Sequence, residues 1–347
     1  MDQKYTITEK QLQILSKFYD LRGKVYATFY ALDKSTQRRI SYEAEEIAAF
    51  SAVANDITSM KELSKDWNTD LIDKLLSTED KVYYSNYLEI LNNFSKTFSK
   101  DINDINTAKL LEINSKLLSQ DSSTFRNSIK EISSTTVEDG IKYEYRSEVR
   151  THPNAISPKL KSFFHWLHTN PEIHPVIKAA VCYFKIAEIH PFSEANGRTS
   201  KIVARSILYK YGLDPELLLT KDDYFLLNQN YYFEMIEQTI KSGDMTKWIE
   251  FYSKALLHGV TQSARLIRYH TAGTIDIIND KIIKITKREM AVMKIINRTQ
   301  NSSGAEIGRE LKMTRQNVNN ILKQLIKRGI IRKIGKSTGV RYIPVNS

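Results

Sequence analysis

The chain has 347 residues, of which 41% are hydrophobic, and it carries a formal net charge of +11. This length predicts a folded protein of two or three domains. The single cysteine, Cys182, excludes an intramolecular disulfide and fits a reducing compartment. No apolar run approaches the roughly 18 residues of a membrane-spanning helix, and the opening "MDQKYTITEK" lacks the apolar core of a signal peptide. We therefore expect a cytoplasmic protein with no membrane partner.

The positive charge is unevenly distributed along the chain. Residues 281–347 contain 16 Lys and Arg against 3 Asp and Glu, whereas residues 1–280 contain 35 against 37. Such asymmetry indicates a basic module attached to a nearly neutral body.

The first 120 residues predict helices separated by polar breaks. Hydrophobic residues recur at near-helical spacing in 40–57, "ISYEAEEIAAFSAVANDI", and again in 70–76 and 83–98. The last of these segments has an apolar stripe that we expect to be buried: Tyr83, Tyr84, Tyr87, Leu88, Leu91 and Phe94. Five of the seven prolines fall in 153–191, so breaks between helices are expected mainly there.

Residues 141–150, "IKYEYRSEVR", alternate apolar and charged side chains and predict a short strand in a hairpin or at an edge. Two helices are expected next, "SPKLKSFFHWLHTN" and "HPVIKAAVCYFKIAEI", each with a proline near its start. Another helix is expected from Asn196 to Tyr211, with Gly212 as its C-cap.

The junction before that helix, "EIHPFSEANGR" (188–198), places a base, an acid and an arginine close together. A helix N-terminus offers free backbone N–H groups and the positive end of a dipole, so it can bind an anion. Arg198 and Lys201 fall on its first turn, and Glu194 could hold a Mg²⁺ that bridges phosphate oxygens. A neutral His190 could take a proton from an attacking hydroxyl. Each residue alone also fits a plain helix junction, but the ordered set indicates phosphoryl or nucleotidyl transfer.

"HPFSEANGRTSK" resembles the signature of the Fic family, His-Pro-Phe-x-(Asp/Glu)-Gly-Asn-Gly-Arg-x-x-Arg. The preceding helix "HPVIKAAVCYFKIAEI" and the later "SGDMTKWIEFYSKAL" fit the same domain. The resemblance implies a mostly α fold: a Fic-type helical bundle with a small β-hairpin flap, formed near 141–150, that docks the target segment by strand addition.

The resemblance also implies an activity, the transfer of AMP from ATP to a Ser, Thr or Tyr hydroxyl of a target protein. In that scheme His190 is the catalytic base and Glu194 positions Mg²⁺. Nucleotide binding is implied for Asn196 and Gly197 at the α-phosphate, for Arg198 and Lys201 at the outer phosphates, and for Tyr231 or Tyr232 near the adenine. For the two tyrosines, burial as core aromatics of a helix is an equal alternative.

The motif departs from the family pattern at two positions. Ala195 replaces a glycine, which is costly if that position needs a positive φ. Lys201 replaces an arginine, which keeps the charge but loses the bidentate fork. Because the base and the metal ligand remain, we expect weakened or altered activity rather than an inactive site.

Many relatives carry an inhibitory helix, (Ser/Thr)-x-x-x-Glu-(Gly/Asn), whose Glu pairs with the arginine of the phosphate site. The matching stretch here is "SAVAND" (51–56), with Asn55 at the position of the Glu. An amide cannot form that ion pair, so we expect the inhibition to be absent or to depend on Asn55 hydrogen bonding. A simple core helix is the alternative for this stretch.

The basic C-terminal segment predicts a winged helix-turn-helix domain. Ser303 and Glu306 form a capping box for a helix over 304–312, and Thr314 caps the next helix. That second helix has an apolar stripe that we expect to be buried: Val318, Ile321, Leu322, Leu325 and Ile326.

The second helix opens with Arg315, Gln316 and Asn317, residue types that hydrogen-bond base edges in the major groove. In the expected hairpin wing, Lys336 and Arg341 are available for phosphates. We therefore expect DNA binding, although such modules also serve as protein scaffolds and often act as homodimers.

The sequence thus predicts four regions: an N-terminal helical region (1–100) with an inhibitory-helix-like segment near 41–57, a Fic catalytic domain (101–265), a helical linker (266–285) and a winged helix domain (286–347). Two functions remain open. One is a Mg²⁺-dependent protein adenylyltransferase with a DNA-binding module, and the other is a transcription regulator whose Fic domain binds nucleotide but transfers it poorly.

Overall fold

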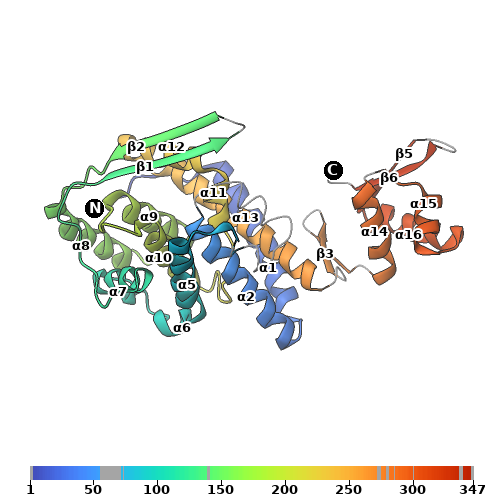
Figure 1. The fold of residues 1–347 in the computed structure, drawn as a ribbon, viewed down its shortest axis with the longest axis horizontal. Coiled ribbons are helices and arrows are strands. Elements are labelled where there is room, and N and C mark those ends of the chain that lie inside the picture. The colour runs from blue at the N-terminus through green and yellow to red at the C-terminus, as the bar shows by residue number, and fades with distance from the viewer. Residues whose placement is uncertain are drawn as a thin grey trace. The chain divides into compact units, whose positions relative to one another are not determined.

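A computed structural model of the chain describes residues 3–54, 72, 74–138, 141–271, 275–278, 281–284, 286–299, 301–335 and 339–344. It divides into two compact units, each considered by itself (Figure 1). The first comprises residues 1–22 and 32–263, and the second comprises residues 23–31 and 264–347. None of the described helices combines the length and apolarity needed to cross a membrane.

Helices make up most of the described chain before residue 271. They are α1 (Glu9–Tyr30), α2 (Lys34–Val53), α5 (Thr78–Asn92), α6 (Phe94–Thr97), the 3₁₀ turn η1 (Ile102–Asp104), α7 (Thr107–Leu117), α8 (Pro153–Thr169), α9 (Pro175–Ile189), α10 (Asn196–Lys210), α11 (Asp222–Leu227), α12 (Gln229–Ser242) and α13 (Thr246–His270). The expectation of a mostly α protein is confirmed.

Helix α9 lies at the centre of the first unit and packs side by side with α10 (Figure 1). Twelve of its 15 residues are buried, which is typical of a helix surrounded by others. The His174 side chain accepts a hydrogen bond from the backbone N–H of Val176, and Pro175 occupies the first turn. The chain therefore enters α9 in a fixed orientation and leaves it at the candidate site.

A fully buried ion network holds the interior of α10. Arg205 lies 3.5 Å from Asp214 and 3.3 Å from Asp222, and Lys221 lies 2.7 Å from Asp222. Despite burial, the cations Lys221 and Arg205 hold the pKa of Asp222 at about 2. The network joins α10 to the segment that leads into α11.

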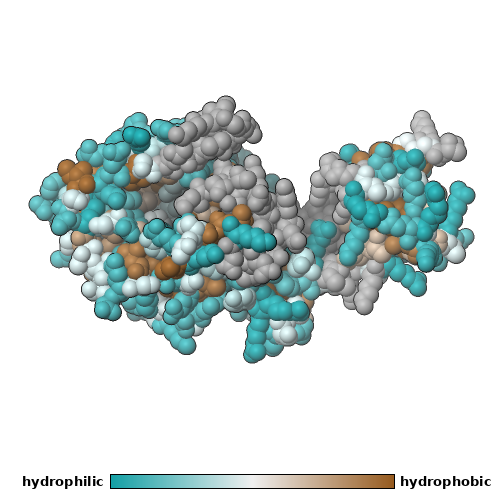
Figure 2. Space-filling view, in the orientation of Figure 1, coloured by the Kyte–Doolittle hydropathy of each residue, from teal (hydrophilic) through white to brown (hydrophobic). Residues whose placement is uncertain are grey.

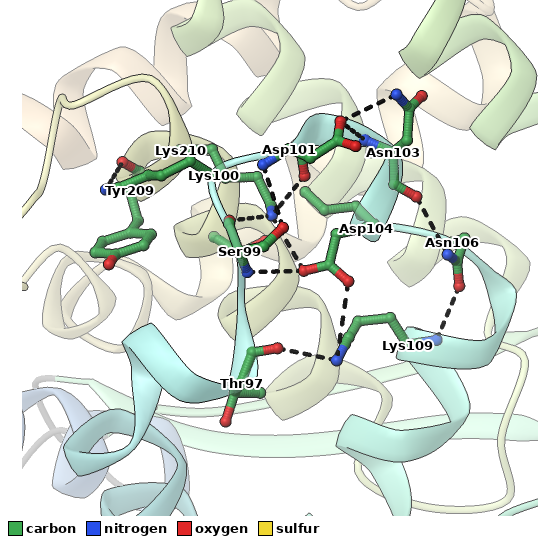
Figure 3. A network of polar contacts seen from close by, with 12 residues as sticks. Thr97, Ser99, Lys100, Asp101, Asn103, Asp104, Asn106, Lys109, Tyr209 and Lys210 are labelled. Atoms are coloured by element: carbon green, nitrogen blue, oxygen red, sulfur yellow. Dashed lines mark hydrogen bonds and ion pairs between the residues drawn. The ribbon is translucent and has the colours of Figure 1, made fainter.

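The C-terminal end of α10 is fixed by a polar loop (Figure 3). Lys210 Nζ donates to the carbonyl oxygen of Asp101 at 2.7 Å, to that of Ser99, and to Asp104 Oδ2 at 3.3 Å. The backbone N–H of Ser99 also donates to Asp104, at 2.9 Å. Lys109 Nζ donates to the carbonyl oxygen of Thr97 at 2.9 Å on the far side of this loop. The interior and the C-terminal end of α10 are therefore held by contacts from other parts of the chain.

Two strands, β1 (Glu131–Glu138) and β2 (Ile141–Glu148), form an antiparallel hairpin in the register Glu131↔Glu148 to Glu138↔Ile141. The hairpin runs along α12 (Figure 1), where Tyr145 stacks on Phe233 with ring centroids 4.3 Å apart. The strand expected from residue 141 is confirmed, and its partner precedes it in the chain.

The second unit begins differently from the sequence expectation. The predicted helical linker over 266–285 is helical only to His270, and strands β3 (Ile275–Ile278) and β4 (Lys281–Lys284) pair antiparallel after it. That expectation was wrong because these strands are rich in isoleucine, whose β-branched side chain favours extended backbone.

Three helices and a second small sheet follow: α14 (Lys287–Thr299), α15 (Gly304–Leu311), α16 (Arg315–Lys327), β5 (Ile331–Ile334) and β6 (Arg341–Pro344). The capping box of Ser303 with Glu306 and the Thr314 cap are both present. Val318, Leu322 and Leu325 enter the core of this unit, together with residues of α14 and β5.

The apolar stripe expected on α16 is wrong at its edges. Ile326 is 36% exposed and Ile321 is only partly buried. Because α16 packs through one narrow face, residues at the margins of the stripe remain near solvent.

The visible surface of both units is mostly hydrophilic, with hydrophobic residues in separate patches (Figure 2).

Candidate active site

The loop between α9 and α10 contains two left-handed residues that are not glycine. His190 has φ 50° and ends α9, with its backbone N–H donating to Ile186 O at 2.9 Å. Ala195 has φ 58° and precedes α10. The sequence concern about Ala195 is therefore justified, since the left-handed region costs an alanine about 1–2 kcal/mol. Strain of this kind is typical of a functional loop.

Asn196 closes this loop on itself. Its Oδ1 accepts from the Phe192 N–H at 2.9 Å, and its Nδ2 donates to the Phe192 carbonyl at 2.8 Å. The side chain is 3% exposed. Its amide is therefore committed to the shape of the loop, which leaves anion binding at this end of α10 mainly to backbone N–H groups.

Arg126 holds the loop from the other side and was not found from the sequence. Its Nε donates to the His190 carbonyl at 2.7 Å, and its backbone N–H donates to the Pro191 carbonyl at 2.9 Å. The same guanidinium reaches the carbonyls of Ser128 and Thr151. Asn114 adds a hydrogen bond from Nδ2 to the Glu194 carbonyl at 3.0 Å. Neither residue sits in a motif, so no local signal could have found them.

A cavity of about 380 Å³ opens beside the loop. Its polar wall comes from the loop and the first turns of α10: His190, Ser193, Glu194, Asn196, Gly197, Arg198 and Lys201. Its remaining wall comes from the end of α2, the hairpin and the aromatic side of α9, α11 and α12, including Ser51, Ala52, Ala54, Ile132, Tyr145, Tyr183, Phe225, Leu226, Gln229, Tyr232, Phe233 and Ile236. One end is therefore polar and cationic, and the other is largely apolar.

Of the two neighbouring tyrosines, only Tyr232 lines the cavity. Its hydroxyl lies 3.4 Å from that of Tyr183. Tyr231 is 43% exposed, packs edge-on against Phe251 and is not part of the cavity wall, so its nucleotide contact stays a prediction without support from the cavity. Adjacent helical positions point about 100° apart, so Tyr231 and Tyr232 face different surroundings.

The cationic end is only partly neutralised within the protein. Burial lowers the pKa of Lys201 to about 8, and burial also lowers the pKa of Arg198. Lys201 Nζ donates to the Ser51 carbonyl oxygen at 3.1 Å, in the last turn of α2. The space beside Gly197 is open, because a Cβ built there meets no atom within 4 Å. This end therefore suits an anionic group placed against the start of α10.

Burial also lowers the pKa of His190, to about 4. The imidazole is therefore neutral at physiological pH and able to accept a proton. Glu194 is exposed on the same wall, so a carboxylate and a neutral base face one cavity.

The remaining expected site residues either do not line this cavity or lie outside the residues that the structure describes. Arg315, Gln316 and Asn317 are exposed at the start of α16, and Arg341 lies on β6. Asn55 and Lys336 lie outside the described residues, so their predicted roles stay predictions.

Comparison with known proteins agrees with this geometry. The family model Fic/DOC matches residues 104–208, the span from the Lys210-bound loop through most of α10. Residues 104–208 therefore form a Fic/DOC family domain.

The chain is similar to proteins named protein adenylyltransferase Fic. The one from Nematostella vectensis is 31% identical over 104 residues, which are 29% of this chain and 23% of that protein. The one from Caenorhabditis elegans, fic-1, is 25% identical over 146 residues, which are 42% and 27% of the two chains. The matched segment thus spans about a quarter of the length of these relatives.

Solved structures share the fold. A Fic family protein from Desulfovibrio desulfuricans G20 superposes with a TM-score of 0.57 at 16% identity and covers 100% of this chain and 99% of that one. A segment of Fic-1 from C. elegans gives 0.51 at 16% identity, covering 73% and 72%.

Proposed function

We propose that this protein is a protein adenylyltransferase that transfers AMP from ATP to a Ser, Thr or Tyr hydroxyl of a target protein. The observation that carries the proposal is the cavity wall itself. A neutral base, an exposed carboxylate, two cations and a helix N-terminus face one space of about 380 Å³. The naming of the relatives as protein adenylyltransferases supports the same reaction.

In this proposal the transfer is a single displacement at the α-phosphorus. His190 takes the proton of the target hydroxyl, whose oxygen forms a bond to the α-phosphorus. The bond from that phosphorus to the bridging oxygen of the β-phosphate breaks, and pyrophosphate leaves. The α-phosphate lies against the backbone at Gly197, and Arg198 and Lys201 hold the outer phosphates.

The donor set fits a magnesium ion that is shared with the nucleotide. Glu194 is the exposed carboxylate of the cavity, and the described residues contain no cluster of three or more potential metal ligands. Mg²⁺ is commonly held by one or two carboxylates together with substrate phosphates. Bound in this way, the ion would offset negative charge on the phosphates.

The hairpin is the candidate docking site for the target. Tyr145 and Ile132 line the cavity from β2 and β1, so a segment paired to the hairpin would lie beside it. Strand addition supplies main-chain hydrogen bonds that do not depend on the side chains of the target. The adenine would occupy the apolar end, next to Tyr232.

For the second unit we propose DNA binding by a winged helix domain in residues 286–347. Exposed Arg315, Gln316 and Asn317 at the start of a capped α16 support this, as does the basic excess of the segment. Homodimers are frequent among such modules, so a dimer on DNA is part of the proposal.

Buried, unpaired Cys182 fits a reducing cytoplasm.

The deciding experiment incubates the full chain with Mg²⁺, ATP labelled on the α-phosphate, and cell lysate. Label on protein that is lost in His190→Ala and kept in His165→Ala, an exposed histidine of α8, would establish transfer through His190. ATP binding without any label would instead favour the second function, a transcription regulator whose Fic domain binds nucleotide but transfers it poorly.

A further inference from the structure

Tyr83 of α5 contacts two side chains of the candidate active site. Its hydroxyl donates toward Glu194 Oε2 at 3.3 Å, and its ring centroid lies 3.6 Å from Arg198 Cζ. The separation from Glu194 is 111 positions in the sequence. No motif includes this tyrosine, and only the packing of α5 brings it to the site.

The contact with Tyr83 bears on whether Arg198 and Glu194 form an ion pair with each other. Glu194 and Arg198 carry opposite charges and line the same cavity, so an ion pair between them would be expected. Among the described residues, neither of these two has an ion pair within 4.0 Å, with the other or elsewhere. Arg198 instead lies against the tyrosine ring, and its Nη1 is buried without a hydrogen-bond partner in the described part of the chain. Arg198, which lines the cavity, therefore keeps one buried donor without a partner among the described residues.

The tyrosine is itself held in place. Its ring packs against an apolar cluster formed by α2, α11 and the segment before α5, which comprises Phe50, Val53, Ile72, Leu76 and Leu226. Its hydroxyl also lies 3.1 Å from Glu79 Oε1, one turn earlier on α5. Because contacts on both the ring and the hydroxyl fix Tyr83, it can act as a rigid surface for Arg198.

We propose that Tyr83 is a positioning residue that keeps Arg198 away from Glu194. The ring face attracts the guanidinium and separates it from the carboxylate, so the arginine stays free for the outer phosphates and the carboxylate for a divalent cation. This inference rests on the proposed function, because it takes a nucleoside triphosphate as the ligand.

The first test measures the affinity of the full chain for ATP and for AMP in the presence of Mg²⁺. Tyr83→Leu keeps most of the side-chain volume but removes the aromatic face, and it should weaken ATP binding about tenfold. AMP lacks the outer phosphates, so its affinity should change less than about twofold. Tyr83→Phe keeps the ring and should recover most of the lost ATP affinity. Tyr84→Leu, the neighbouring tyrosine of α5, whose hydroxyl lies 3.5 Å from Glu46 of α2, is the matched control.

The second test separates positioning from general stability. In an Arg198→Ala background, Tyr83→Leu should have little further effect on ATP affinity, because the two residues act as one unit. Additive losses, equal losses for ATP and AMP, or an ATP affinity unchanged in Tyr83→Leu would each overturn the proposal.

A crystal structure of Tyr83→Leu decides the point without any nucleotide. We expect a guanidinium nitrogen of Arg198 to lie within about 4 Å of a Glu194 carboxylate oxygen, the range of an ion pair. An arginine that stays in its original place would overturn the role of Tyr83. Failure of the wild-type chain to bind ATP would instead refute the proposed function, and this structure would still decide the role of Tyr83.

Discussion

Lys201 Nζ donates a hydrogen bond to the carbonyl oxygen of Ser51, 3.1 Å away, and so connects the first turns of α10 to the last turn of α2. The two residues are 150 positions apart in the sequence. Carbonyl groups at a helix C-terminus carry partial negative charge, which favours a cation there. The lysine that replaces the arginine of the family motif is therefore held by α2 at the edge of the cavity.

Burial of Lys201 should make nucleotide affinity depend on pH. Burial lowers the pKa of Lys201 to about 8, so the ammonium loses its charge as the pH rises through that value. Below pH 7 the lysine is charged, and near pH 9 it is mostly neutral. We expect ATP affinity to fall across this interval, as measured by calorimetric titration. Lys201→Met should bind ATP about tenfold more weakly near pH 7 and lose the decline. A decline of equal size in Lys201→Met would assign it to another group.

The fall in the rate of the transfer reaction at acidic pH should follow the protonation of His190. Its burial places the pKa at about 4, well below the value near 6.5 of a free histidine. The imidazole therefore stays neutral, and active as a base, as the pH falls from 7 to 5. We expect kcat/KM to drop only near pH 4, because this ratio reports ionisation of the free enzyme. A limb centred near 6.5 would show that the base is exposed to solvent in the working protein.

Replacing Ala195 with glycine should stabilise the protein without adding any contact. Its φ of 58° is strained for alanine and unstrained for glycine. We expect Ala195→Gly to raise the free energy of unfolding by about 1 kcal/mol, measured by denaturant titration. Ala204→Gly, in the interior of α10, should lower the same free energy by about 1 kcal/mol or more. Destabilisation by both changes would mean that the alanine methyl group contributes packing that outweighs its strain.

The buried ion network that holds the interior of α10 should be the most sensitive to charge removal. Arg205→Met leaves Asp214 and Asp222 facing each other in the interior with less positive charge. We expect a loss of about 3–5 kcal/mol in the free energy of unfolding, seen as a large fall in the denaturation midpoint.

An exposed ion pair provides the comparison for Arg205. Lys116 and Glu112 on α7 lie 2.7 Å apart, and their side chains are 46% and 38% exposed. Lys116→Met should cost less than about 1 kcal/mol, because water screens such pairs. Equal losses from the two variants would mean that the buried aspartates take up protons instead of remaining charged.

Several parts of the fold and the site follow from short stretches of sequence. The Ser303–Glu306 capping box and the Pro175 start of α9 predict helix ends because they act through hydrogen bonds and sterics within one turn. His190, Glu194 and Arg198 lie within nine positions, so a single loop is enough to bring them together. Their chemistry could be inferred from residue type and spacing alone.

The sequence predicted less well which side chains are buried, because tertiary packing decides this. It could not distinguish Tyr231 from Tyr232 as a wall of the cavity, because both fit an apolar face of α12. It also gave Ile326 a buried position that the narrow packing face of α16 does not provide. In both cases the side of a helix that is covered depends on which neighbour lies against it.

Sequence patterns alone thus predicted most of the helices, several of their caps and the loop that carries the candidate chemistry, but not strands β3 and β4. Only the tertiary structure showed that Tyr83, Arg126 and Ser51 contact that loop or the first turns of α10. The reason is physical. Local hydrogen bonding and backbone conformation are set by adjacent residues, whereas contacts across 64 to 150 positions form only when separate helices and loops pack together.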